Sequence, residues 1–79
     1  MNETEELKKI GERLKKLRIK NGYGSYEDFA IKNDLSRMQY WRLEKGKTNL
    51  TFRSLIVILK IHNISLADFF SDDFSDIPK

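Results

Sequence analysis

The sequence predicts an all-α fold, a compact bundle of five helices that contains a helix-turn-helix. Two short helix-forming segments begin at good N-cap residues, Ser25 and Ser36, and only a tight polar turn fits between them. Apolar residues elsewhere recur at helical spacing, and no segment has the alternating pattern of a strand. With 79 residues, the chain is long enough for one small domain.

A first helix is expected over residues 4–21. Its apolar residues recur at three- and four-residue spacing between Lys and Arg, so they share one face: Leu7, Ile10, Leu14 and Leu17. Thr4 is placed to cap this helix at its start. Asn21 and the two glycines that follow end the helix, because glycine readily takes the left-handed conformation that closes a helix terminus.

The helix-turn-helix begins with a helix over about residues 26–33, which is expected to bury Phe29 and Ala30. Ala30 is small, and we expect the next helix to cross closely at that point because a bulkier side chain would push the two helices apart. Asn33 and Asp34 form the turn, since both residue types tolerate positive φ better than most.

The second helix of the motif, over about residues 37–45, has two different faces. At roughly 100° per residue, Tyr40 and Leu43 fall on one side with Glu44 beside them, and this side must be the core. The opposite side carries Met38, Trp41, Arg42 and Lys45. This combination suits a groove of bases flanked by phosphates better than plain solvent. The alternative is that Trp41 packs on a neighbouring helix.

A basic loop follows over residues 45–49. Gly46, Lys47 and Thr48 copy the end of a phosphate-binding P-loop, but Trp41 stands where that motif requires a glycine, and helical sequence precedes the loop. We therefore expect the loop to contact a DNA backbone. The alternative is an ordinary exposed turn.

A fourth helix opens at Thr51 and is apolar over most of its circumference. In so small a domain, such a helix is either the central core helix or also part of a subunit contact. Asn63 is expected to end it, and Ser65 to cap a short fifth helix. His62, near the end of the fourth helix, is expected to help satisfy the terminal carbonyl groups.

The charges divide into a basic body and an acidic end. The formal net charge is +3, and residues 1–64 carry fourteen Lys or Arg against eight acidic residues, whereas residues 65–79 carry one Lys against four Asp. This division predicts a polyanion-binding surface, with a solvated surface as the alternative. We expect a domain over residues 1–70 and an acidic tail over residues 71–79.

Several classes of function are not expected. The chain has no Cys and a single His, so it lacks the ligands of a disulfide framework or a zinc cluster. We find no nucleophile with a nearby base, no paired carboxylates and no cofactor loop, and we therefore expect neither an enzyme nor a cofactor-binding or metal-binding protein. The polar, acidic start differs from a signal peptide, which favours a cytoplasmic protein without a membrane partner.

The residues singled out so far resemble the Cro/C1-type helix-turn-helix family of phage repressors and small bacterial regulators. The resemblance covers about residues 7–70, and its marks are spread along the chain: Ile10, Arg13, Leu14, Leu17, Arg18, Phe29, Ala30, Leu35, Ser36, the run 43–47, Leu55, Ile58, Leu59 and the ending 64–70. It implies a lambda repressor-like bundle of five helices whose third helix enters the major groove, usually as a two-fold dimer on a palindromic site. Tyr40 departs from the pattern at a position that is usually aliphatic.

The resemblance, together with the outward side of the third helix, indicates which residues meet DNA. Base contacts are expected from the outward side of the third helix: Arg37, Met38, Trp41 and Arg42. Phosphate contacts are expected from the start of the second helix, the third helix and the basic loop: Ser25, Tyr26, Gln39, Lys45, Lys47, Thr48 and Asn49. A structural ion pair between Arg18 and Glu44 is expected to tie the first helix to the third.

The sequence therefore predicts a sequence-specific regulator that binds double-stranded DNA, acts as a repressor and works as a homodimer. The alternative is an antitoxin or another protein-interaction module. Such a module would bind a partner protein through the fourth helix, the fifth helix or the tail, using apolar residues near the end of the chain: Phe69, Phe70, Phe74 and Ile77.

Overall fold

The computed structural model describes residues 3–71 and contains five α-helices in this range. They are α1 (Glu3–Lys20), α2 (Tyr26–Lys32), α3 (Arg37–Lys45), α4 (Phe52–His62) and α5 (Leu66–Phe69). No strand occurs among the described residues, so the prediction of an all-α fold with five helices is confirmed. The expected tail over 71–79 lies, apart from Ser71, outside the described residues.

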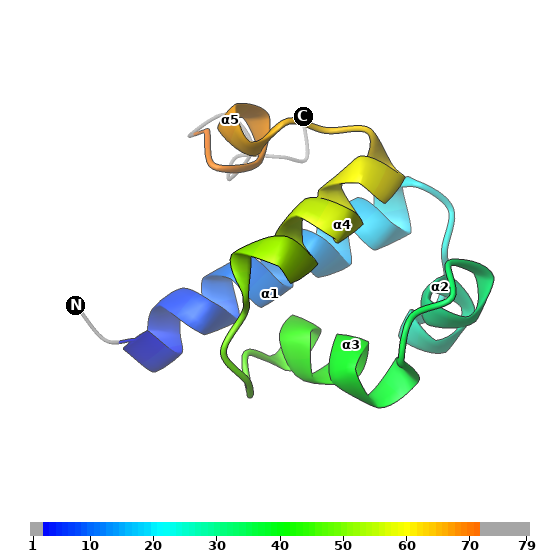
Figure 1. Cartoon of the computed structure of the whole chain (residues 1–79), viewed down its shortest axis with the longest axis horizontal. Coiled ribbons are helices and arrows are strands. Elements are labelled where there is room, and N and C mark those ends of the chain that lie inside the picture. The colour runs from blue at the N-terminus through cyan, green and yellow to red at the C-terminus, as the bar shows by residue number, and fades with distance from the viewer. Residues whose placement is uncertain (1–2, 72–79) are drawn as a thin grey trace.

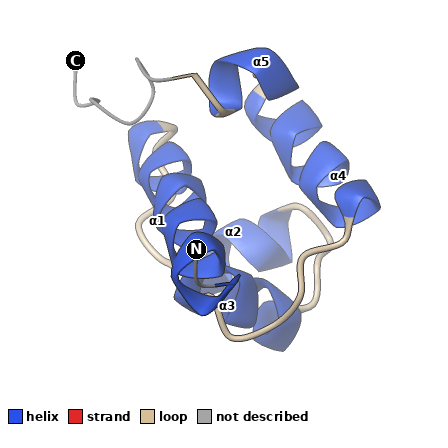
Figure 2. Cartoon of the chain, turned by 90° about the vertical axis from the view of Figure 1, so that its left-hand side faces the viewer, coloured by secondary structure: helices blue, strands red, loops and turns tan. Residues whose placement is uncertain are grey.

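The helices enclose a core to which each of them contributes. Seen as in Figure 2, α1 and α4 form two sides of the bundle, the α2–α3 pair closes it at the bottom, and α5 covers the top. Figure 1 shows the same pair, α2 and α3, at the edge opposite α5. The buried apolar residues are Leu14, Leu17, Phe29, Ala30, Tyr40, Leu55, Ile58, Leu59 and Phe69. Because Phe29 and Tyr40 pack with ring centroids 4.8 Å apart, the two helices of the helix-turn-helix share this core.

The local signals in the sequence set most helix boundaries. Four residues act as N-caps whose side-chain oxygens accept hydrogen bonds from backbone N–H groups in the first turn: Ser25, Ser36, Thr51 and Ser65. The donor–acceptor distances are 3.0 to 3.3 Å. Asp34 takes φ 60° in the turn of the helix-turn-helix, and Asn63 takes φ 57° where α4 ends. Both left-handed residues lie where the sequence predicted a turn or a helix end.

Two local predictions are wrong. α1 begins at Glu3, so Thr4 lies inside its first turn rather than at its cap. His62 does not satisfy the terminal carbonyl groups of α4: its Nε2 has no hydrogen-bond partner among the described residues, and the backbone N–H of left-handed Asn63 donates to the Leu59 and Lys60 carbonyl oxygens. Instead the His62 ring stacks on Phe29 at a centroid distance of 5.0 Å, and its Nδ1 is 3.0 Å from the Asn21 Nδ2.

α4 is a core helix that also exposes apolar side chains. Leu55, Ile58 and Leu59 are buried, whereas Phe52 is 68% exposed and Val57 is 42% exposed. α4 therefore also has exposed apolar side chains of the kind that a subunit contact would need.

Candidate nucleic-acid interface

α3 presents one face to the core and the other to solvent. Tyr40 and Glu44 are buried and Leu43 is half-buried, as its helical wheel predicts. The exposed residues of α3 are Arg37, Met38, Gln39, Arg42 and Lys45. Trp41 is half-buried, at the boundary between the two faces. The exposed face thus combines cations, an amide and an apolar side chain.

A buried ion pair fixes the position of α3 on α1. The Arg18 Nε donates to the Glu44 Oε2 at 2.7 Å, and the Arg18 Nη2 donates to the Glu44 Oε1 at 3.3 Å. The same guanidinium donates from Nη1 to the carbonyl oxygen of Tyr23 at 2.9 Å. Arg18 is 5% exposed and Glu44 is 8% exposed. A two-point contact at this depth holds the helix in one orientation, which a base-reading surface requires.

Two glycines allow the end of α3 to approach α1 closely. A Cβ on Gly11, inside α1, would overlap the carbonyl oxygens of Leu43 and Glu44. Gly46 closes α3 in the left-handed conformation with φ 70°, and a Cβ there would lie 2.8 Å from the Lys8 backbone. Sequence reasoning did not identify either close approach. The available signal for the first was a glycine inside an otherwise regular helical pattern.

The loop after α3 begins with the hydrogen bonds that close this helix. The backbone N–H of Lys47 donates to the Arg42 carbonyl oxygen at 2.9 Å. Lys45, Lys47 and Asn49 are exposed, and Thr48 is half-buried. The loop therefore extends the exposed basic face of α3 beyond the last residue of the helix.

The other residues expected to contact phosphates lie elsewhere. Ser25 and Tyr26 are half-buried at the start of α2, and the Ser25 hydroxyl oxygen accepts the hydrogen bond of the N-cap from Asp28. Gln39 is exposed on the side of α3 that faces α4. The expected phosphate contacts are thus divided among the start of α2, the flank of α3 and the loop at the end of α3.

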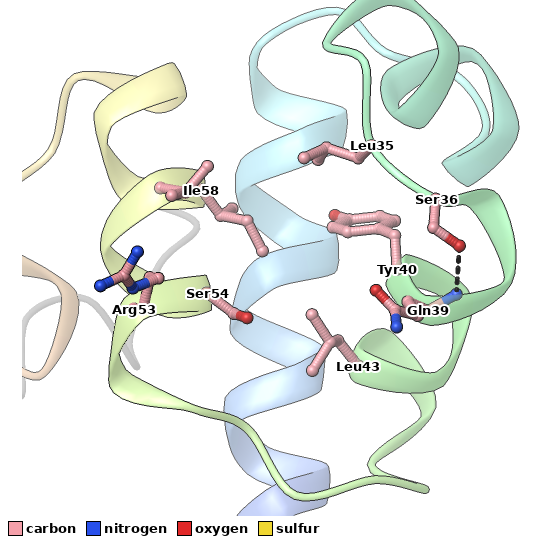
Figure 3. Close-up of a pocket in the computed structure, with 9 residues that line it drawn as sticks. Leu35, Ser36, Gln39, Tyr40, Leu43, Arg53, Ser54 and Ile58 are labelled. Carbon is pink, nitrogen blue, oxygen red and sulfur yellow. Dashed lines mark hydrogen bonds between the residues drawn. The ribbon is translucent and has the colours of Figure 1, made fainter.

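A groove separates α3 from α4 beside Gln39. In Figure 3, Leu35 and Tyr40 extend toward Ile58 on the opposite helix. Arg53 lines the α4 side of this groove and is exposed. Sequence reasoning missed Arg53, although a cation in the first turn after a basic loop was a usable signal.

Tyr40 brings a hydroxyl group into the core. Tyr40 is 2% exposed, and no hydrogen bond of standard geometry joins its hydroxyl oxygen to another residue in the range 3–71, although the Glu44 carboxylate is close enough to act on it. Burial, with the neighbouring Glu44 carboxylate acting in the same direction, raises the pKa of Tyr40 above its ordinary value. The phenol is therefore neutral, and no phenolate competes with the Glu44 carboxylate for the Arg18 guanidinium.

Within residues 3–71, no three potential metal-ligating side chains lie close enough together to hold an ion. None of the described helices has both the length and the apolar character needed to cross a membrane.

Comparison with known proteins places this chain among regulatory proteins. Control protein C.MunI from a Mycoplasma species is 39% identical to it over 64 residues, which are 81% of this chain and 86% of that relative. The chain belongs to the control-protein family. Membership supports a regulator rather than an enzyme, and it loosely supports the resemblance to Cro/C1-type proteins. No protein-family model matches the chain, and no solved structure does.

Proposed function

We propose that this chain is a sequence-specific transcriptional regulator, acting as a repressor, that reads the major groove of double-stranded DNA with α3. Its similarity to a control protein supports a DNA-binding regulator. The observation that carries the finer proposal is the exposed face of α3, which is rich in cations and is held by the buried Arg18–Glu44 pair. A rigid helix with such a face has the chemistry that base edges and phosphates require.

The base contacts come from the exposed side of α3. Arg37 and Arg42 are exposed, and a guanidinium can donate two hydrogen bonds to the O6 and N7 atoms of guanine. Met38, which is 59% exposed, offers an apolar contact for the methyl group of thymine. Trp41 adds apolar surface at the edge of this face.

The phosphate contacts come from residues around α3. Lys45 and Lys47 supply charge at the end of the helix, where Thr48 and Asn49 add polar groups. The remaining contacts in this proposal are Ser25, Tyr26 and Gln39, and Arg53 adds a cation on the α4 side of the groove. Such contacts fix the register of a protein on the duplex without reading its sequence.

The binding species in this proposal is a symmetric homodimer. One short helix reads too few bases for useful specificity, and two copies on half-sites about one helical turn apart double the number that is read. The exposed Phe52 and Val57 on α4 are the apolar surface that we assign to the contact between the two copies.

Selection of bound duplexes from a random pool tests this function, because it reports specificity and half-site spacing together. We expect a recovered consensus with two inverted half-sites about one helical turn apart. Footprinting on the recovered duplex should protect both half-sites. Recovery of no consensus would contradict sequence-specific reading, and protection of a single half-site by a monomer would contradict the dimer.

A second candidate is a protein-interaction module, such as an antitoxin. The observation that favours it is the exposure of two aromatic side chains: Phe52, the first residue of α4, is 68% exposed, and Phe70, the residue after α5, is 48% exposed. A module of this kind needs no exposed cationic face on α3. Charge-removing substitutions at Arg37 and Arg42 should then leave regulation in cells unchanged, whereas the DNA-binding proposal requires its loss.

A further inference from the structure

The N-terminal half of α1 lies beside the loop that follows α3. A Cβ on Gly46 would lie 2.8 Å from the nitrogen, Cα and Cγ atoms of Lys8, so the stem of the Lys8 side chain runs along the start of this loop. One turn further along α1, Gly11 lies against the carbonyl groups of Leu43 and Glu44. These contacts define the side of α1 that meets the end of α3, and Lys8 is at the edge of that side.

We propose that Lys8 contacts a DNA phosphate, so that α1 supplies a phosphate-binding residue beside the loop over 45–49. This inference rests on the proposed DNA-binding function, and it adds a helix that the sequence analysis did not include among the phosphate contacts. Lys8 is exposed and has no ion-pair or hydrogen-bond partner among residues 3–71.

The charge around Lys8 supports this assignment. Lys45 and Lys47 flank Gly46, and both are exposed without a carboxylate partner among the described residues. Three lysines thus belong to the segments that meet where α3 ends, and none of them forms an ion pair with another residue in the range 3–71. Such a cluster attracts a polyanion, and each phosphate that it neutralises releases counterions from DNA.

The opposite side of α1 differs. Lys9 forms an ion pair with Glu6 at 3.5 Å, and Arg13 donates to the Phe69 carbonyl oxygen at 3.2 Å, which turns that side toward α5. α5 and α3 lie at opposite ends of the bundle (Figures 1 and 2). Lys16 lines the surface beside Arg13 and is exposed. It is therefore a matched control of the same residue type on the same helix.

A purely structural role for Lys8 makes a different prediction. A cation next to the end of α3 can stabilise the carbonyl groups at the helix C-terminus. In that case its removal lowers the free energy of unfolding and leaves the salt dependence of DNA binding unchanged.

The test compares Lys8→Gln with Lys16→Gln, because Gln keeps most of the side-chain stem and has a similar helix propensity. Binding to a random-sequence duplex and to the duplex recovered by selection is measured against salt concentration. We expect Lys8→Gln to lower the slope of log affinity against log salt by about 0.9, which is a loss of about eightfold at 0.1 M salt if the lines meet at 1 M. The loss should be equal on the two duplexes, and Lys16→Gln should keep the wild-type slope.

Two results would overturn the assignment of Lys8. An unchanged slope for Lys8→Gln, with wild-type DNA binding intact, removes Lys8 from the interface and leaves the proposed function standing. If Lys16→Gln lowers the slope of log affinity against log salt by the same amount, the effect comes from the net charge of the protein rather than from the position of Lys8. Failure of the wild-type chain to bind either duplex is a different result, because it overturns the proposed function itself together with this inference.

Discussion

At the scale of single residues, the buried polar groups affect both the stability of the fold and the position of the exposed face of α3. Arg18 and Glu44 satisfy each other, and Arg18 also satisfies the Tyr23 carbonyl group, so their charges are tolerated at a depth where an unpaired charge is not. The Tyr40 hydroxyl and His62 Nε2 are buried nearby without partners among the described residues. One buried pair is therefore satisfied, whereas two buried polar atoms carry a desolvation cost.

Glu44→Ala should destabilise the fold strongly. It leaves the Arg18 guanidinium buried without its carboxylate, which typically costs about 3 to 5 kcal/mol. Chemical denaturation of the variant and the parent measures the difference, and Glu6→Ala, which breaks an exposed pair with Lys9, is the control. An unchanged midpoint for Glu44→Ala would show that the pair does not support the fold.

Tyr40→Phe should leave the stability unchanged or raise it. The substitution keeps the ring that packs on Phe29 and removes a hydroxyl that has no partner within residues 3–71. Burial of such a group typically costs about 1 to 3 kcal/mol, and this cost is relieved. The free energy of unfolding gives the answer directly. A loss of more than about 1 kcal/mol would mean that the hydroxyl is hydrogen-bonded in the folded protein.

His62 should make stability depend on pH. Burial lowers the pKa of His62 below its ordinary value of 6.5, so below that pH the unfolded chain binds a proton that the folded protein resists. Stability should therefore fall as the pH drops below 6.5, by at most about 1.4 kcal/mol per pH unit from this residue. Unfolding measured near neutral pH and in mild acid should show a smaller drop for His62→Gln. Parallel curves for the parent and the variant would contradict this.

At the scale of helices, local sequence decides where elements begin and end, whereas packing decides what they touch. Ser25 and Ser36 could be identified as caps from the sequence because a cap acts within one turn. The stacking of His62 on Phe29 and the approach of Gly46 to Lys8 depend on how distant segments cross. No spacing rule within a single helix contains that information. The inward side of α3 was predictable since a helical wheel needs only the helix itself.

The same distinction applies to the candidate site. The exposed side of α3 and the basic loop followed from periodicity and residue type. Arg53 and Lys8 did not, because each belongs to a helix that reaches the area around α3 only in the folded bundle. The helical wheel predicted that Trp41 faces outward, whereas in the structure it is half-buried. A wheel of α3 alone does not show which residues of other helices cover part of this side chain.

Arg42 and Lys47 should separate specificity from affinity. Arg42→Ala removes a proposed two-point contact with guanine and should cost about 1 to 3 kcal/mol on the selected site, with little loss on scrambled DNA. Lys47→Ala removes a phosphate contact and should weaken both duplexes by similar factors while lowering the salt slope by about one. Titration of each variant with both duplexes distinguishes the two roles. If Arg42→Ala weakens binding to the selected and the scrambled duplex equally, Arg42 does not read bases, and Arg37 with Gln39 becomes the better assignment of the base contacts.

At the scale of the whole molecule, the arrangement of charge and apolar surface follows the arrangement of the helices. The cationic face of α3 and the loop after it lie at one end of the bundle, and α5 lies at the other (Figure 2). The exposed apolar residues of α4, Phe52 and Val57, belong to a different helix from this cationic face. The proposed contact with a second copy therefore uses other side chains than the cationic face of α3, and its Val57 borders the groove that Arg53 also lines.

The central claim is that the chain reads DNA sequence through a cationic helix face, and one measurement tests it most directly. Binding of the wild-type chain is measured on the selected duplex and on a scrambled duplex over a range of salt concentrations. We predict a steep fall in affinity with salt on both, since several Lys and Arg release counterions from phosphates, and an affinity at least about 10³-fold higher for the selected duplex at physiological salt. Absence of binding at low salt, an affinity that salt does not change, or equal affinity for the two duplexes would contradict the claim.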